Sequence, residues 1–166
     1  MRAKIATLTG EIAPDQLGKI YIHEHVLTDP PPSRMRLDPD YKLDSIEKIV
    51  AELNLFYAAG GRSLMDCTAL DYGRDAKRML EVARQVKVNI LALTGFNRGD
   101  YVDWVRNGDE GLFEELIMKD IEEGMDGTAC KPAVIKIGTG YNNILPSELK
   151  TIKAAGRAHQ QSGLPV

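Results

Sequence analysis

The stretch Lys19-Ile-Tyr-Ile-His-Glu-His-Val26 decides between the folds open to this chain. Its apolar start predicts a strand, and the three prolines at 30–32 that follow it indicate a loop without regular structure. Successive side chains of a strand point to opposite faces, so His23 and His25 are predicted to lie on one face, a few ångströms apart. Two imidazoles placed in this way can bind one metal ion.

Segments typical of strands and helices alternate along the rest of the chain. An N-terminal ribbon near residues 4–12 precedes the first strand, and residues 164–166 resemble the beginning of a further strand. Strict alternation with crossover helices predicts a parallel sheet with right-handed connections. Between these ends we expect strands at 63–68, 88–94 and 133–139, and helices that start near Asp44, at Asp75, before Leu112 and at Ser147, the N-cap of the last helix.

Two architectures have this order of elements: a doubly wound open sheet and a (β/α)8 barrel. An open sheet that binds a dinucleotide requires a Gly-x-Gly-x-x-Gly motif after its first strand. Here that place holds His-Glu-His and the prolines, which favours the barrel. A complete barrel needs about 250 residues. We therefore expect residues 1–166 to form one α/β domain, the N-terminal half of a TIM barrel, with four strand–helix units and the start of strand five.

The composition limits the class of partner. The formal net charge is -3 and both signs are interleaved, so the sequence lacks the basic patch that a nucleic-acid or anionic-membrane surface requires. No apolar stretch reaches the roughly 20 residues that cross a bilayer. Cys67 and Cys130 are the two cysteines, without Cys-x-x-Cys spacing, which is typical of a reducing compartment. We expect a cytoplasmic protein with a small-molecule substrate and neither a nucleic-acid nor a membrane partner.

Lys136 is a second unusual residue, because it lies inside the predicted strand 133–139. Alternation places Val134 and Lys136 on one face and Ile135 on the opposite, helix-covered face, so the lysine is predicted to point into the barrel. A buried ammonium is costly unless it is paired. One interpretation is therefore a carboxylate partner, or an aliphatic stem that carries the charge to the surface.

A second interpretation starts from the same burial, which lowers the pKa of a lysine and leaves a nucleophilic amine. Such an amine can add carbon dioxide, and the resulting carbamate has two oxygens and a negative charge. In barrels the chemistry gathers at the carboxyl ends of the strands, where His23, His25 and Lys136 are predicted to lie. Carboxylated Lys136 could then bridge two divalent ions, an arrangement that ionises a shared water.

Five segments together resemble the phosphotriesterase family of the amidohydrolase superfamily, in the same order and spacing over nearly the whole chain. They are Ile22-His-Glu-His25, Asp71-Tyr-Gly-Arg-Asp75, Asn89-Ile-Leu-Ala-Leu-Thr-Gly95, Glu123-Gly-Met-Asp-Gly-Thr128 and Val134-Ile-Lys-Ile137. The resemblance implies a (β/α)8 barrel with a binuclear metal centre. It also implies that His23 and His25 hold the more buried ion and that carboxylated Lys136, the catalytic residue, bridges both ions.

The resemblance implies further ligands, two histidines and an aspartate from strands five, six and eight, which lie outside this sequence. We therefore expect the chain alone to be an inactive half-barrel. It is then the N-terminal half of a longer protein, a half that another chain completes, or a remnant that does no chemistry. The complete protein is expected to be a homodimer that holds two divalent ions, zinc by default, with manganese or cobalt as alternatives. The remaining histidine, His159, falls in the last predicted helix and is expected to be solvated.

Within the family, the sequence is most similar to the branch that opens lactones of phosphorylated sugars. The similarity rests on Thr68-Ala-Leu-Asp-Tyr-Gly-Arg74, Gly95-Phe-Asn-Arg98 and Gly138-Thr-Gly-Tyr-Asn142. It implies that a metal-bridging hydroxide attacks the lactone carbonyl. Phosphotriesterases and acyl-homoserine lactonases are the alternatives, but they usually carry an aromatic residue where this chain has Asn97, and a polar residue there suits a sugar better.

Polar residues just past the third and fourth strands are the candidates for substrate contact. Asn97, Arg98 and Tyr141 occupy these places, and Arg98 could form a bidentate pair with a phosphate. A solvent-facing arginine is the alternative.

Four other polar residues receive structural interpretations. Asp66 and Thr68 end the second strand, where we expect them to satisfy backbone groups, with a role in the barrel mouth as the alternative. Asp75 is expected to cap a helix, and Arg74 to tie loops together rather than to contact substrate.

Overall fold

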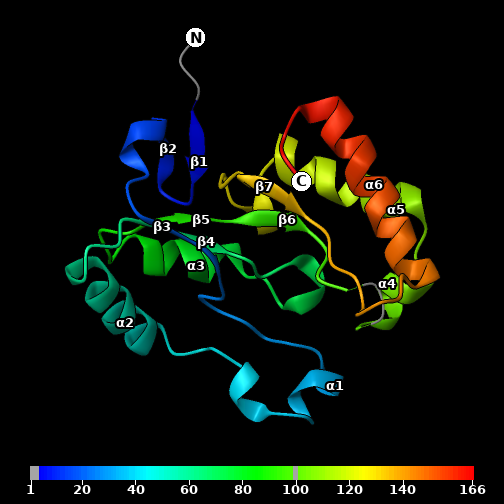
Figure 1. The fold of residues 1–166 in the computed structure, drawn as a ribbon, viewed down its shortest axis with the longest axis horizontal. Helices are drawn as coiled ribbons and strands as arrows, with labels where there is room; N and C mark the ends of the chain where they lie inside the picture. The colour runs from blue at the N-terminus through cyan, green and yellow to red at the C-terminus, as the bar shows by residue number, and fades with distance from the viewer. Residues whose placement is uncertain (1–3, 99–100) are drawn as a thin grey trace.

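Parallel strands alternate with helices along the chain, as the sequence predicts (Figure 1). The computed structural model describes residues 4–98 and 101–166. The strands are β1 (Ile5–Thr7), β2 (Gly10–Ile12), β3 (Ile20–Glu24), β4 (Ser63–Asp66), β5 (Asn89–Leu91), β6 (Leu93–Gly95) and β7 (Val134–Lys136). The helices are α1 (Pro32–Met35), α2 (Ile46–Ala58), α3 (Ala76–Ala83), α4 (Asp103–Asn107), α5 (Glu110–Glu122) and α6 (Pro146–Ser162), with short 3-10 turns η1 (Pro14–Gln16), η2 (Pro39–Tyr41), η3 (Leu70–Tyr72) and η4 (Met125–Gly127).

The order of the strands is that of half a (β/α)8 barrel, in which strands that follow one another along the chain are neighbours in the sheet. After the antiparallel ribbon of β1 and β2, strands β3, β4 and β5 pair in parallel in that order, and β6 pairs in parallel with β7. The predicted strand 88–94 is divided into β5 and β6 at Ala92. The Ala92 carbonyl accepts a hydrogen bond from the Ala133 N–H at 2.7 Å, so the strand changes its partner from β4 to β7 at this residue.

Helix ends follow the predicted capping at α3, with corrections at two other helices. The Asp75 carboxylate accepts the Arg78 N–H at 3.1 Å to cap α3, as predicted. The helix expected to start near Asp44 is capped one residue later, by the Ser45 side chain. The prediction that Ser147 caps the last helix is wrong. The cap lies two residues earlier, at Leu145, and the helix begins at Pro146, because proline suits the first helical position and the Glu148 carboxylate accepts the Leu145 N–H at 2.8 Å.

The helices cover the outer face of the strands in two groups. Helices α2 and α3 pack with β4, β5 and the residues that follow β3 around one apolar cluster, which includes Leu27, Met79 and Ile90. Helices α5 and α6 pack on each other and on β6 and β7 around a second cluster, which includes Phe113 and Ile135 (Figure 1). No helix in the described ranges is both long and apolar enough to cross a membrane.

A buried arginine joins these two groups. Arg74 donates to both carboxylate oxygens of Asp120 at 2.6 and 3.1 Å, to Asp126 at 2.7 Å and to the Leu93 carbonyl at 3.2 Å. Its side chain therefore links the segment after β4 to helix α5 and to η4. This confirms the prediction that Arg74 ties loops together.

The last residues of the chain run beside β7. No strand is assigned to residues 164–166, but the Ile135 N–H donates to the Pro165 carbonyl at 2.8 Å. His159 is exposed, as predicted, and its Nδ1 lies 2.8 Å from the Leu164 carbonyl oxygen.

Candidate metal centre

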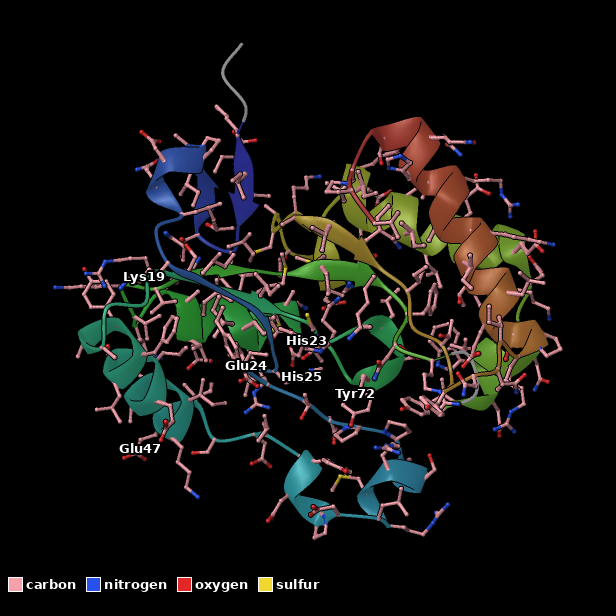
Figure 2. The ribbon with its side chains drawn as sticks, viewed as in Figure 1. Lys19, His23, Glu24, His25, Glu47 and Tyr72 are labelled. Carbon is pink, nitrogen blue, oxygen red and sulfur yellow. The ribbon has the colours of Figure 1, made fainter. Side chains whose placement is uncertain are left out.

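The two histidines of the His-x-His pair lie together at the end of β3, although not on a regular strand. Tyr21 is paired with Leu64, but Glu24 is paired with Asp66, so β3 contains one extra residue at this point, a β-bulge. The bulge interrupts the simple alternation on which the prediction was based. The imidazole rings of His23 and His25 are nevertheless edge to face, with their centroids 5.8 Å apart. Figure 2 shows both histidines near the end of the strand that begins after Lys19.

The ring of His25 is fixed by its surroundings. Its Nδ1 lies 2.9 Å from the Thr68 hydroxyl oxygen, and its ring centroid is 5.6 Å from that of Tyr72 (Figure 2). Burial, together with the positive charges of Lys136 and His23, lowers the pKa of His25 to about 4. The imidazole is therefore neutral near pH 7, which is the form that binds metal ions.

Thr68 has a role that the sequence left as the less favoured alternative. Thr68 is fully buried, and its hydroxyl contacts the imidazole of His25 at the mouth of the barrel rather than a nearby backbone group. Asp66 behaves as predicted, since its two carboxylate oxygens accept the backbone N–H groups of Val26 at 2.6 Å and Thr68 at 2.8 Å. Burial raises the pKa of Asp66 to about 6, although these hydrogen bonds oppose the rise.

Lys136 lies on the inner face of β7, as predicted. Its Nζ donates to the Cys67 carbonyl oxygen at 2.8 Å, and no carboxylate in the described ranges lies within ion-pair distance of it. Burial lowers the pKa of Lys136, and the neighbouring acidic groups Asp71 and Asp66 only partly oppose this. The carboxylate partner that one interpretation requires is therefore absent from this part of the chain. Ile135, by contrast, is buried among the helices.

His23 and Lys136 line one cavity of about 300 Å³ on the inner face of the sheet. The remaining wall is mostly apolar and includes Met65, Leu93 and Val134. The structure thus brings together residues that are 113 positions apart in the sequence.

The donor set of this cavity fits part of a divalent metal centre. Neutral imidazole nitrogen and carbamate oxygen are suitable ligands for zinc and similar ions. Within residues 4–98 and 101–166, no three His, Cys, Asp or Glu side chains are grouped as a metal site by themselves. His23, His25 and Lys136 would therefore supply some of the ligands, and the rest of the coordination would come from elsewhere.

The loop after β6 is held by a buried carboxylate that the sequence analysis did not single out. Asp71 is 2% exposed and accepts the backbone N–H groups of Asn97 at 2.6 Å and Arg98 at 2.8 Å. A carboxylate that accepts two consecutive N–H groups fixes the direction of the loop. Its place inside the segment Asp71-Tyr-Gly-Arg-Asp75 was the signal that could have identified it.

Arg98 is paired with a second buried carboxylate. Its Nε donates to Glu148 at 3.3 Å, and its guanidinium carbon lies 5.4 Å from the ring centroid of Tyr101. The Arg98 side chain is 31% exposed, so it is partly buried as well as paired. A Cβ at Gly140 would lie 3.0 Å from Nη2 of Arg98, so the loop after β7 approaches the guanidinium. Tyr141 is 94% exposed, and substrate contact by Asn97, Arg98 and Tyr141 stays a prediction.

Known proteins share this arrangement of strands and helices. The model of the phosphotriesterase family matches residues 3–166. The phosphotriesterase homology protein of Escherichia coli K12 is 32% identical over 92% of this chain and 52% of its own length. The phospho-furanose lactonase of Mycoplasmopsis agalactiae is 28% identical over 98% of this chain and 50% of its own length.

A solved structure agrees with these relatives. The crystal structure of a lactonase from Listeria monocytogenes superposes with a TM-score of 0.87 at 34% identity, over 96% of this chain and 54% of that one. This chain spans about half the length of the relatives that it matches. On the evidence of the fold, the inward-facing residues and these matches, the chain belongs to the phosphotriesterase family.

Proposed function

We propose that the protein containing this chain is a metal-dependent hydrolase that opens the lactone ring of a phosphorylated sugar. The observation that carries the proposal is the convergence of His23 and Lys136 on one cavity, with the ring of His25 beside that of His23. The phospho-furanose lactonase of Mycoplasmopsis agalactiae supports the same class of substrate.

The residues of this chain would position the reacting groups. His23 and His25 would hold one of two divalent ions, zinc or alternatively manganese or cobalt, and Lys136, carboxylated at Nζ, would hold both. Such ions, when bound, lower the pKa of a coordinated water toward about 7 and polarise a carbonyl group. Carboxylation joins Nζ of the neutral amine to the carbon of carbon dioxide and releases one proton. The lowered pKa of Lys136 favours this step, because it increases the fraction of neutral amine.

The loop after β6 would select the substrate. Asp71 fixes the backbone of Arg98, and Glu148 fixes the direction of its guanidinium through Nε. A planar guanidinium held in one direction suits a phosphate group, which accepts charge-assisted hydrogen bonds. The polar Asn97 beside it suits a sugar rather than an aryl ester or a fatty acyl chain.

The test is a comparison of substrates with the natural protein that contains this chain. The protein would be treated with a chelator, reloaded with zinc, manganese or cobalt, and assayed on four substrates. These are a phosphorylated pentonolactone, its unphosphorylated form, an acyl-homoserine lactone and a phosphotriester. We expect the highest kcat/KM on the phosphorylated lactone, with loss of activity on chelation and recovery on reloading. Activity that survives chelation, or a preference for the triester, would contradict the proposal.

A further inference from the structure

Thr68 contacts one of the two candidate metal ligands but not the other. Its Oγ1 lies 2.9 Å from Nδ1 of His25, across 43 positions of sequence, and the threonine is completely buried. No hydrogen bond to the ring of His23 is formed in the part of the chain that the structure describes, and His23 is exposed. The two histidines therefore differ in how strongly the protein controls their rings.

The direction of the hydrogen bond between Thr68 and His25 follows from the form in which the ring would bind a metal ion. Nδ1 faces the Thr68 hydroxyl at 2.9 Å, so a metal ion would bind through Nε2. A neutral imidazole has one N–H and one nitrogen with a free lone pair, and only the latter binds a metal. The proton of His25 would then reside on Nδ1, and the Thr68 hydroxyl would accept this hydrogen bond.

We infer that Thr68 is a positioning residue that holds His25 as the Nδ1–H tautomer, with the Nε2 lone pair directed to a divalent metal ion. The inference rests on the proposed function in one respect, that His25 is a metal ligand. A histidine that binds a metal through one nitrogen commonly donates its other ring N–H to a fixed partner, and loss of that partner weakens metal binding about 10- to 100-fold. Here the partner is a hydroxyl, and Asp66 accepts the backbone N–H of the same threonine at 2.8 Å.

The chain offers two internal references for the tautomer. His159 has its Nδ1 2.8 Å from a carbonyl oxygen, which can only accept, so His159 must also be the Nδ1–H tautomer. His23 has no such partner among the described residues. The nitrogen chemical shifts of the imidazoles distinguish the two tautomers. His159 is the reference for the Nδ1–H signal expected of His25, and His23 is the reference for a ring without such a partner.

The first measurement uses the natural protein, labelled with 15N at histidine and freed of metal. The wild-type protein should show His25 as the Nδ1–H tautomer, like His159. Thr68→Val keeps the shape of the side chain without the hydroxyl, and it should abolish this preference at His25 only. Thr68→Ser keeps the hydroxyl and should restore it. A wild-type His25 that carries its proton on Nε2, or a tautomer unchanged in Thr68→Val, would overturn the inference.

The second measurement is the affinity for zinc, measured by competition with a chelating dye. We expect Thr68→Val to weaken binding at least tenfold and Thr68→Ser to stay within about threefold of the wild type. Thr94→Val is the matched control, because Thr94 is equally buried and its hydroxyl donates to another aspartate, Asp120, at 2.6 Å. Equal losses in Thr68→Val and Thr94→Val would overturn the positioning role.

The two measurements separate this inference from the proposed function. The tautomer of His25 is read without metal or substrate, so it tests the hydrogen bond to Thr68 directly. A wild-type protein with the expected tautomer that hydrolyses no lactone would contradict the proposed function and support the assignment of the hydrogen bond. A lactonase in which His25 carries its proton on Nε2 would support the proposed function and contradict the assignment of the hydrogen bond.

Discussion

At the scale of single residues, Arg98 is the side chain on which the choice of substrate depends. Hydrogen bonds to a charged group contribute about 1.5 to 3 kcal/mol each, so Arg98→Ala should lower kcat/KM at least about tenfold on a phosphorylated lactone. The loss should be much smaller on the same lactone without its phosphate, because that substrate offers no charged acceptor. Steady-state kinetics on the two lactones measures the difference.

Arg62→Ala is the control for that experiment. Arg62 also lies over an aromatic ring, 4.2 Å from the centroid of Tyr57, but it precedes β4 at the opposite end of the strands. Its removal should leave the ratio of the two rates unchanged. If Arg98→Ala lowered both rates alike, the loop would act on the lactone or on the fold rather than on the phosphate.

Asp66 makes stability depend on pH. Its pKa is about 6 in the folded protein, above the ordinary value of 3.8, so the folded state binds the proton more tightly than the unfolded state. The stabilising contribution of the protonated group is therefore complete below pH 3.8 and is lost as the pH rises through 6. Asp66→Asn removes this titration, although it also disturbs two backbone hydrogen bonds.

We expect the free energy of unfolding of Asp66→Asn, relative to the wild type, to improve by roughly 2 to 3 kcal/mol between pH 4 and pH 7. Urea unfolding of both proteins at several pH values measures the change. A difference that stays constant over this range would show that Asp66 does not titrate there.

At the scale of elements, the ion pairs of Arg74 hold α5 and η4 against the strands. The side chains of Arg74 and Asp120 are 1% and 8% exposed, so Arg74→Met leaves a buried carboxylate without its partner. Such a loss costs about 3 to 5 kcal/mol of stability. Lys4→Met is the comparison, because its pair with Glu11 is exposed and screened by solvent, so its loss should change stability far less. Equal effects in urea unfolding would show that burial does not decide the contribution of Arg74.

The positions of the elements were predictable from the sequence, and their exact ends were not. Apolar periodicity located the parallel strands and the longer helices, and Asp75 marked one helix start. It missed the short helices α1 and α4, and α1 begins at Pro32, which was predicted to lie in an irregular loop. The division of the strand at Ala92 depends on a change of neighbour, from β4 to β7, which leaves no local pattern. The start of α6 was missed because Glu148, three residues beyond the cap, outweighs the capping tendency of Ser147.

The site was predictable to a similar extent. His23, His25 and Lys136 were identified from spacing and from a lysine inside a strand, and the structure places His23 and Lys136 on one cavity with His25 adjacent. Their supporting contacts were not predictable. Thr68 reaches His25 across 43 positions of sequence, and Asp71 reaches the loop of Arg98 across 27, because barrel closure, not sequence distance, determines which loops meet.

At the scale of the whole molecule, the inner face of the sheet is open. Ile22 on β3 is 70% exposed, and Tyr21 beside it is 52% exposed. Apolar side chains on an edge strand promote association unless other strands cover them. Expressed alone, the 166-residue chain should bind a hydrophobic dye strongly and lack lactonase activity with zinc present. An active, monodisperse monomer of this length would contradict this expectation.

Anomalous diffraction from the zinc-loaded natural protein tests most directly whether His23, His25 and Lys136 share one metal centre. We predict two anomalous peaks in the cavity. One should lie about 2.0 to 2.1 Å from a ring nitrogen of both His23 and His25, with carbamate density joining Nζ of Lys136 to both ions. The absence of zinc at the two histidines, with an unmodified Lys136 still bonded to the Cys67 carbonyl, would contradict it.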